Sequence, residues 1–258
     1  MPRSQYAAGV DASPIPDSLP LGVVFDQAEK RFGSLLALRR VSFEIAPGEF
    51  LLLLGHNGSG KTTLLRMAAM LSKPTSGRVR YSGAAANGSA EIRQRIGVVG
   101  HHTLLYDELT AEENLRFFAK LYGLPNTSQA ALAALEPAGL RDRARDLVRT
   151  FSRGMRQRLA IARALLASPS LLLLDEPASG LDRAGAAWLA QTLRERKKAG
   201  CTVVMSSHGQ NETTALATRA IAMRGGSLIA DSGSGGDVRT VIEEHAGSGE
   251  EPLAVPQS

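Results

Sequence analysis

A glycine-rich segment carries the strongest chemical signal in this sequence. Residues 55–62 read Gly-His-Asn-Gly-Ser-Gly-Lys-Thr, which is the complete phosphate-binding loop pattern. The segment lies where that pattern must lie, between a leucine run at 51–54 and a stretch with helical spacing. Glycines let the backbone curl so that several N–H groups and the N-terminus of the next helix point at phosphate oxygens. The segment therefore predicts a triphosphate site.

Individual residues of this loop have separate expected roles. Lys61 should reach the β- and γ-phosphates and neutralise charge during the reaction, and Thr62 should ligate Mg²⁺. A glycine-rich turn before an ordinary helix is the alternative, which the completeness and placement of the pattern disfavour. The residues expected to bind the nucleotide here are Gly55, His56, Asn57, Gly58, Ser59, Gly60, Lys61, Thr62 and Thr63.

A pair of acidic residues follows a second aliphatic run. Leucines at 171–174 precede Asp175 and Glu176, so a buried strand would bring both carboxylates to the sheet edge where ligands bind. Asp175 suits the magnesium shell, and Glu176 is placed to orient the water that attacks the γ-phosphate. Such a pair can also be a plain turn. Its combination with the phosphate loop favours the catalytic interpretation.

The elements that must position these residues alternate between strand and helix. Short apolar stretches separated by turn residues predict strands between residues 21 and 54. Further strands are expected at 77–81, 92–99, 171–174 and 203–206. Helices are expected along the spacing of Leu64, Ala68 and Leu71, at 112–122 and 129–135, and along the face of Met155, Leu159, Ala162 and Leu166. This alternation predicts an α/β fold with a mostly parallel sheet flanked by helices.

The chain is expected to divide into a central domain and two ends of different composition. With 258 residues and 43% hydrophobic content, it can bury one large core, with or without a smaller lobe. Residues 1–20 are expected to be a flexible arm, residues 21–232 the working domain, and residues 233–258 a flexible tail. The net charge of +5 is spread along the sequence and argues only weakly for an anionic partner.

Cysteine content and hydropathy bear on the compartment. Cys201 is the only cysteine, so no intramolecular disulfide can form, and a cytosolic protein fits. The first 20 residues contain several prolines and no apolar run of signal-peptide length. The longest aliphatic runs are far too short to cross a bilayer as a helix. If the protein works at a membrane, another chain must supply the span.

A third motif gives the sequence a family resemblance. Residues 151–158 read Phe-Ser-Arg-Gly-Met-Arg-Gln-Arg, in which Ser152 is expected to cap a helix and Gly154 to allow close backbone approach, making a second anion site. From about residue 23 to residue 231 the chain resembles the ATP-binding cassette ATPases, and this segment resembles their signature. The usual signature has two adjacent glycines and then Gln. Here Arg153 and Met155 replace the first glycine and the Gln.

The resemblance implies a fold, cofactors and partners. The fold is a phosphate-loop NTPase core with a mostly parallel sheet, an antiparallel β subdomain, and a helical subdomain at about 102–150. The cofactors are ATP and Mg²⁺. The implied unit is a dimer, a homodimer in the simplest case, in which Ser152 and Gly154 of one subunit close on ATP held by the other. An integral membrane permease is the further partner, with this chain peripheral at the cytoplasmic face of the cell membrane.

Further residues match the family position by position. Residues 179–182, Ser-Gly-Leu-Asp, resemble the loop for crosstalk between subunits. His208 resembles the switch histidine, which contacts the γ-phosphate and contributes to catalysis, although a histidine taken alone is more often a loop or core residue. Phe32 resembles the aromatic ring that stacks on adenine, with core packing as the alternative. His101 stands where the family usually has a Gln that touches magnesium and water. The His101–His102 pair as a metal or haem site is disfavoured.

The wording of residues 100–110, together with the signature, most closely resembles haem exporter ATPases of cytochrome c maturation. ATPases of drug, antibiotic and polysaccharide exporters share much of it, and the membrane partner largely selects the cargo. A phosphate-loop kinase or GTPase is disfavoured by the signature and by the missing Asn-Lys-x-Asp sequence. A cassette ATPase acting on nucleic acid is a further alternative, but a single compact cassette is expected to have no nucleic-acid partner.

Overall fold

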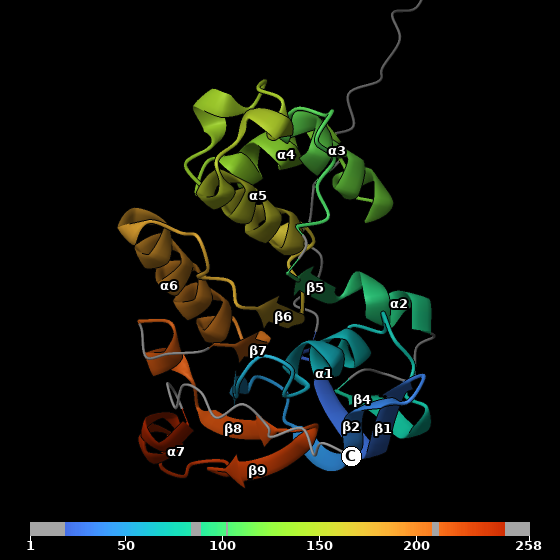
Figure 1. The fold of residues 1–258 in the computed structure, drawn as a ribbon. Helices are drawn as coiled ribbons and strands as arrows, with labels where there is room; N and C mark the ends of the chain where they lie inside the picture. The colour runs from blue at the N-terminus through green and yellow to red at the C-terminus, as the bar shows by residue number, and fades with distance from the viewer. Residues whose placement is uncertain (1–18, 84–88, 102, 208–211, 246–258) are drawn as a thin grey trace, which may run out of the picture.

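The computed structural model describes residues 19–83, 89–101, 103–207 and 212–245. Its centre is a six-stranded sheet in the order β5-β6-β7-β3-β8-β9, beside a three-stranded sheet in the order β2-β1-β4 (Figure 1). The large sheet contains β3 (Phe50–Leu54), β5 (Ile96–Val99), β6 (Leu171–Asp175), β7 (Thr202–Ser206), β8 (Arg219–Arg224) and β9 (Ser227–Asp231). The small sheet contains β1 (Gly22–Phe32), β2 (Leu35–Ile45) and β4 (Ser76–Ser82).

The two sheets differ in the relative direction of their strands. In the large sheet β5, β6, β7, β3 and β8 run parallel, and β9 pairs antiparallel with β8. In the small sheet β1 pairs antiparallel with both neighbours. The predicted α/β fold, with a mostly parallel sheet, an antiparallel subdomain and a helical subdomain, is therefore confirmed.

The central strands are buried on both faces, which explains their unbroken aliphatic sequences. Side chains alternate across a strand. Leu51 and Leu53 of β3 accordingly face one core, shared with the antiparallel sheet and helix α1 (Lys61–Ala68). Leu52 and Leu54 face a second core, shared with α5 (Arg153–Leu165), α6 (Arg183–Lys198) and α7 (Val238–His245).

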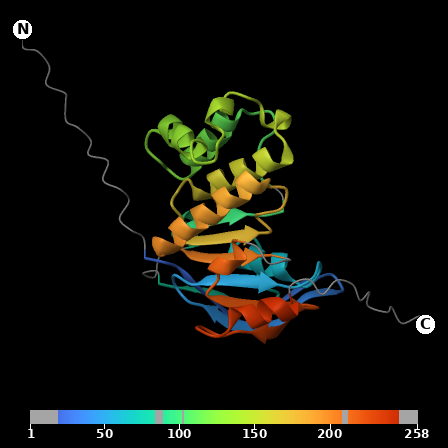
Figure 2. The same ribbon diagram turned by 90° about the vertical axis from the view of Figure 1, so that its left-hand side faces the viewer.

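A helical lobe lies at one end of the molecule, with β8, β9 and α7 at the other (Figure 2). The lobe contains α3 (Ala111–Leu121), α4 (Thr127–Leu135) and the short helices η1 (Arg141–Arg143) and η2 (Val148–Thr150), and α5 joins it to the sheet. A capping box between Thr110 and Glu113 starts α3. The buried Asn114 side chain bonds both the N–H and the carbonyl of Tyr106, which fixes the loop that enters the lobe.

Three expectations from the sequence need correction. Residues 92–94 belong to the helix α2 (Ser89–Gln94), so the strand predicted over 92–99 begins only at Ile96. Leu71 lies outside α1 and is 63% exposed, because Met70 adopts a left-handed conformation and the Leu71 N–H returns to the Arg66 carbonyl, ending the helix. The tail expected from residue 233 contains α7, whose Val241 and Ile242 pack in the second core.

The arm expected at 1–20 and the rest of the tail fall mostly outside the described residues, of which positions 19 and 20 lead into β1. None of the helices in the described ranges combines the length and apolar character that a membrane span requires.

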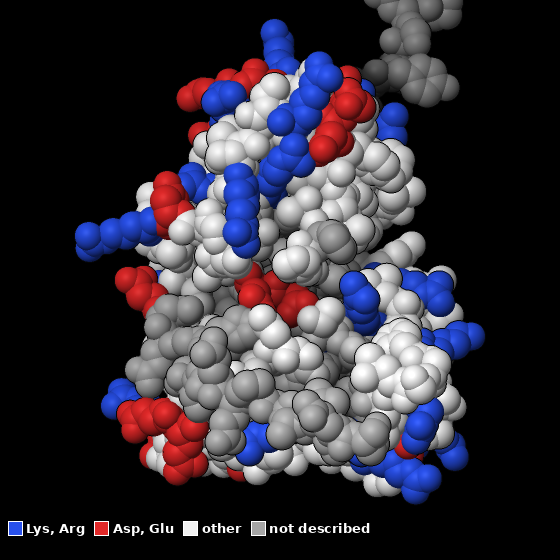
Figure 3. All heavy atoms as spheres, in the orientation of Figure 1, with Lys and Arg blue, Asp and Glu red and all other residues white. Residues whose placement is uncertain are grey.

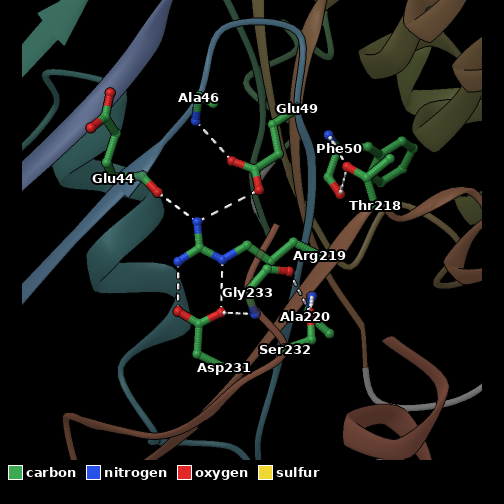
Figure 4. A network of polar contacts seen from close by, with 10 residues as sticks. All are labelled: Glu44, Ala46, Glu49, Phe50, Thr218, Arg219, Ala220, Asp231, Ser232 and Gly233. Atoms are coloured by element: carbon green, nitrogen blue, oxygen red, sulfur yellow. Dashed lines mark hydrogen bonds and ion pairs between the residues drawn. The ribbon is translucent and has the colours of Figure 1, made fainter. Parts of the chain in front are cut away.

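Arg219 links the two sheets through one polar network (Figure 4). Its guanidinium forms two bonds to the Asp231 carboxylate, Nε lying 2.7 Å from Oδ1, and donates to the Glu44 carbonyl at 2.8 Å. It also lies 3.6 Å from the Glu49 carboxylate. The network joins β2, the start of β3, β8 and β9. Arg219 holds the pKa of Asp231 below its usual range through these hydrogen bonds.

Replacing this carboxylate tests the network. Asp231→Asn should lower the free energy of unfolding by about 1 kcal/mol at pH 7, because the pair is partly exposed to solvent. A lowered folded-state pKa means that the carboxylate stabilises the fold above the unfolded-state pKa of about 3.9, and that this contribution is lost as the pH falls through the folded-state value. Urea unfolding should show a smaller difference between wild type and variant at pH 3. An equal difference at both pH values would contradict this account.

Candidate active site

The carboxyl ends of three parallel strands meet at one edge of the large sheet. Ser206, the last residue of β7, pairs with Asp175 at the end of β6 and with Leu53 near the end of β3. Because the strands share a direction and a register, the segments that follow them lie together. Those segments are the glycine-rich loop, the acidic pair, and the region after β7.

Backbone geometry explains the glycines of the loop. Gly55, Gly58 and Gly60 all have positive φ values, of 138°, 79° and 107°. A Cβ atom on Gly55 would lie 2.3 Å from the Met223 carbonyl oxygen, and one on Gly60 would lie 2.9 Å from that of Ala37. The loop is therefore packed against β8 and β2 and keeps its curl only with glycine at these positions. His56, Asn57 and Gly58 form its exposed apex.

Lys61 is the first residue of α1 and is buried inside the loop. Its Nζ donates to the carbonyls of Gly55 and His56, the second at 3.0 Å. Burial lowers the pKa of Lys61, and the nearby negative charges of Glu176 and Asp175 partly oppose that shift. The loop thus encloses a cation that faces two carboxylates.

The loop passes a test of fit for a phosphate group. Ser59 is buried, and its Oγ has no hydrogen-bond partner within the part of the chain that the structure describes. The left-handed glycines leave a cradle that a side chain would fill, and α1 begins directly behind it. Oxygen-rich anions suit such a place, since backbone N–H groups and a helix N-terminus favour negative charge.

Two hydroxyl groups hold the Asp175 carboxylate. Thr62 Oγ1 donates to Oδ2 at 2.7 Å, and Ser206 Oγ donates to Oδ1 at 2.7 Å. The structure therefore brings together the two residues expected from the sequence to bind magnesium. Ser206 was not expected at the site. A polar residue ending an otherwise apolar buried strand was the available signal, but it identifies no partner by itself.

Glu176 has a strained backbone. Its φ is +52°, in the left-handed region that residues other than Gly, Asn and Asp rarely adopt. Its N–H donates to Ser206 Oγ at 2.9 Å, so one serine holds the carboxylate of Asp175 and the backbone of Glu176. Thr63 lies half-buried on α1. His208, the expected switch histidine, falls outside the described residues.

The predicted second anion site lies at the N-terminus of α5. Ser152 Oγ accepts the Met155 N–H at 3.2 Å, so the predicted helix cap is confirmed. Gly154 lies against the Gly180 carbonyl oxygen, to which an added Cβ would approach within 2.9 Å. This end of α5 contacts residues 177–182, the loop between β6 and α6.

Phe32 ends β1 and is 49% exposed, with the Lys30 ammonium 5.1 Å from the ring centroid. Core packing therefore does not account for this ring. Phe32 pairs with Leu35 in the hairpin whose next residues include Ala37, the neighbour of Gly60. Phe32 therefore lies on the β1–β2 hairpin that borders the phosphate loop, and its ring lies outside the core.

A cavity of about 110 Å³ adjoins the Thr62–Asp175 pair, and His101 is among its lining residues. The sequence places His101 at the position of the usual Gln, and the structure sets it close to the two expected magnesium ligands. The other lining residues are mainly apolar and include Leu65, Leu71, Val98, Leu104 and Leu173. On this face acidic side chains occupy a hollow below the helical lobe, at the level of β6 (Figure 3).

Comparisons with known proteins agree on one family. The family model described as ABC transporter matches residues 38–179. The chain is 42% identical over 197 residues to the ABC transporter ATP-binding protein NatA of Bacillus subtilis, covering 75% of this chain and 80% of that protein. It is 37% identical over 235 residues to the daunorubicin resistance ATP-binding protein DrrA3 of Streptomyces coeruleorubidus, covering 87% and 74%.

Further similarities concern an exporter and a solved structure. The Nod factor export ATP-binding protein I of Burkholderia thailandensis is 37% identical over 226 residues, which cover 86% of this chain and 73% of that protein. A dimeric post-hydrolysis state of an ATP-binding cassette with ADP and Pi superposes with a TM-score of 0.74 at 30% identity. The superposition covers 81% of this chain and 97% of that one.

Two glycines of the loop provide a matched pair for testing its geometry. Gly55→Ala should lower the free energy of unfolding by about 3 kcal/mol, because a methyl group meets the Met223 carbonyl at a strained φ. Gly58→Ala, where an added Cβ meets nothing within 4 Å, should cost about 1 kcal/mol for the left-handed conformation alone. Urea unfolding measures both. Equal losses in the two variants would show that the close packing against β8 is not what constrains the loop.

Proposed function

We propose that this chain, which belongs to the ABC transporter family, powers export of a small molecule through a separate membrane subunit. As a member of that family it binds and hydrolyses ATP. The observation that carries the proposal is the site at the sheet edge. There the phosphate loop, Lys61 and the Thr62–Asp175 pair lie together, on the same chain as the serine-capped helix of the signature.

Thr62 and Asp175 are the proposed magnesium ligands. Hydroxyl and carboxylate oxygens are the donors that Mg²⁺ prefers, and Thr62 Oγ1 lies 2.7 Å from Asp175 Oδ2. When bound, the ion would supply positive charge to the β- and γ-phosphate oxygens.

The chain's own residues would perform the remaining work of hydrolysis. The N–H groups of residues 55–63 and the Lys61 ammonium bind the phosphates and stabilise the charge that develops on them. Glu176 orients the attacking water. Ser206 holds both Asp175 and the backbone of Glu176, so the metal ligand and the water-orienting carboxylate are fixed relative to each other.

A second copy of this chain would complete the site. Ser152 and Gly154 of one subunit are proposed to close on the γ-phosphate held by the phosphate loop of the other, with His208 as a further γ-phosphate contact and Phe32 against the adenine. The similar dimeric cassette with ADP and Pi supports this arrangement. Only the closed dimer offers ATP both anion sites, so ATP favours closure and hydrolysis releases the pair.

The proposed docking face for the membrane subunit lies beside the catalytic edge. Exposed apolar side chains occur in and near the helical lobe and next to the cavity that His101 lines: Leu71, Leu104, Tyr106, Phe117 and Leu121. Exposed apolar patches commonly mark protein interfaces. A permease bound here would sense movement at Thr62 and Asp175 through the cavity wall, with this chain peripheral at the cytoplasmic face of the cell membrane.

Small-molecule export is the proposed transport direction and cargo class. The relatives named for daunorubicin resistance and Nod factor export support it. Haem export is the second candidate. It is supported only by the amino-acid sequence of residues 100–110, where His101 replaces the usual Gln. None of these relatives is named for haem. A nucleic-acid partner is not proposed.

Membrane coupling is tested by purifying this chain from its native membranes with its membrane subunit and reconstituting the complex in vesicles. ATP hydrolysis should rise several-fold over that of the isolated chain, and DNA or RNA should have no effect. Leu121→Asp, which puts a charge on the docking face, should abolish most of this stimulation, so that the rate with the membrane subunit stays close to the variant's own unstimulated rate. Ile229→Asp makes an equally large change at an exposed position of β9, away from the docking face, and should leave the stimulation unchanged.

The transported molecule is tested in the same vesicles by adding haem or daunorubicin and measuring any further stimulation of ATP hydrolysis. Stimulation by daunorubicin supports drug export, and stimulation by haem supports the second candidate. ATP hydrolysis that ignores the membrane subunit but responds to DNA or RNA would contradict the proposed function.

A further inference from the structure

One face of α5 holds the loop that follows the catalytic carboxylates. Arg153 Nη2 donates to Ser179 Oγ at 2.7 Å, and Gln157 Nε2 donates to the Pro177 carbonyl at 3.0 Å. Arg158 pairs with Asp182, whose carboxylate also caps α6. The three α5 side chains therefore bind residues 177–182 at the beginning, the middle and the end.

Arg153 also interlocks with this loop sterically. Gly180 has a φ of +79°, and a Cβ atom there would lie 2.8–2.9 Å from Nε, Cδ and Cγ of Arg153. On the other side, Gly154 lies against the Gly180 carbonyl oxygen. The stem of Arg153 thus lies against Gly180 while its guanidinium reaches Ser179, so the first turn of α5 packs closely on the loop.

The loop begins at the strained residue Glu176. A left-handed conformation in such a residue costs about 1–3 kcal/mol and persists only where its surroundings hold it. On the N-terminal side the Ser206 hydroxyl holds the Glu176 N–H. On the C-terminal side the Ser179 N–H donates to the Glu176 carbonyl at 3.0 Å, and α5 adds the contacts of Gln157 to Pro177 and of Arg153 to Ser179. The backbone of Glu176, from which its carboxylate projects, is therefore held from both sides.

We propose that Arg153 is a positioning residue for hydrolysis, which fixes the loop after Glu176 to the N-terminus of α5. This inference rests on the proposed function, because it gives Glu176 the water-orienting role. The usual signature of the family has glycine at the position of Arg153, and glycine has no side chain that could reach Ser179. The contact is thus a property of the arginine in this chain.

The location of Arg153 gives the contact a consequence for the dimer. Ser152 and Gly154, its neighbours on both sides, form the surface that closes on the partner's nucleotide in the proposed assembly. A shift of this turn moves Arg153 and, through Ser179, the loop that holds Glu176. Arg153 would in this way link closure over one nucleotide to hydrolysis of the other.

The contact is tested by steady-state ATP hydrolysis of the full chain with Arg153→Ala, Ser179→Ala and the double variant. Each single variant should lower kcat about fivefold, the effect expected for loss of one partly exposed hydrogen bond. The KM for ATP should stay within twofold of wild type. The double variant should be no slower than the single variants, because both remove the same contact.

Arg194→Ala is the matched control, since it removes an exposed arginine of α6 whose side chain, among the described residues, donates to Gln191 of the same helix. It should keep wild-type kcat. A raised KM in Arg153→Ala, or multiplied losses in the double variant, would show that Arg153 contacts nucleotide directly and would overturn the proposal. Unchanged kcat in both single variants would overturn it as well. Full hydrolysis by Glu176→Gln would instead refute the role of Glu176 in the proposed function.

Discussion

The parallel register of β3, β6 and β7 is the constraint on which the rest of the site depends. Ser206 pairs with both Leu53 and Asp175, so the three strands end at one level. A phosphate loop after β3 and an acidic pair after β6 become one site only because of this alignment. Buried aliphatic side chains on both faces of each strand fix the register, since a shift by one residue would exchange the two cores.

The buried charges of the site destabilise the fold, and they also make the site selective for its ligand. Lys61 and Asp175 are buried, and an isolated buried charge destabilises a fold by several kcal/mol. Here the lysine is surrounded by loop carbonyls and faces two carboxylates, while Thr62 and Ser206 donate to both oxygens of Asp175. The polar groups are thus oriented in advance. A triphosphate with its metal ion is a ligand whose charges match that arrangement.

The sequence predicts local patterns well and contacts between distant segments poorly. The phosphate loop, the buried strands and the Ser152 cap follow from spacing and residue type within a few positions. The bonds of Ser206 to Asp175 and of Arg153 to Ser179 join segments about 26–31 residues apart, and no local pattern encodes them. Errors arose where one residue decides the outcome: the left-handed Met70 ends α1 before Leu71, and the apolar Val241 and Ile242 turn part of an expected tail into a packed helix.

In the proposed dimer, ATP is held between the phosphate loop of one subunit and the Ser152–Gly154 turn of the other. Sedimentation velocity of Glu176→Gln with ATP and Mg²⁺ would detect this dimer, because a variant that binds but does not hydrolyse ATP should accumulate the closed state. The account predicts a dimer that retains ATP, and a monomer when ADP replaces ATP. A variant that binds ATP and remains monomeric, also with its membrane subunit present, would contradict the account.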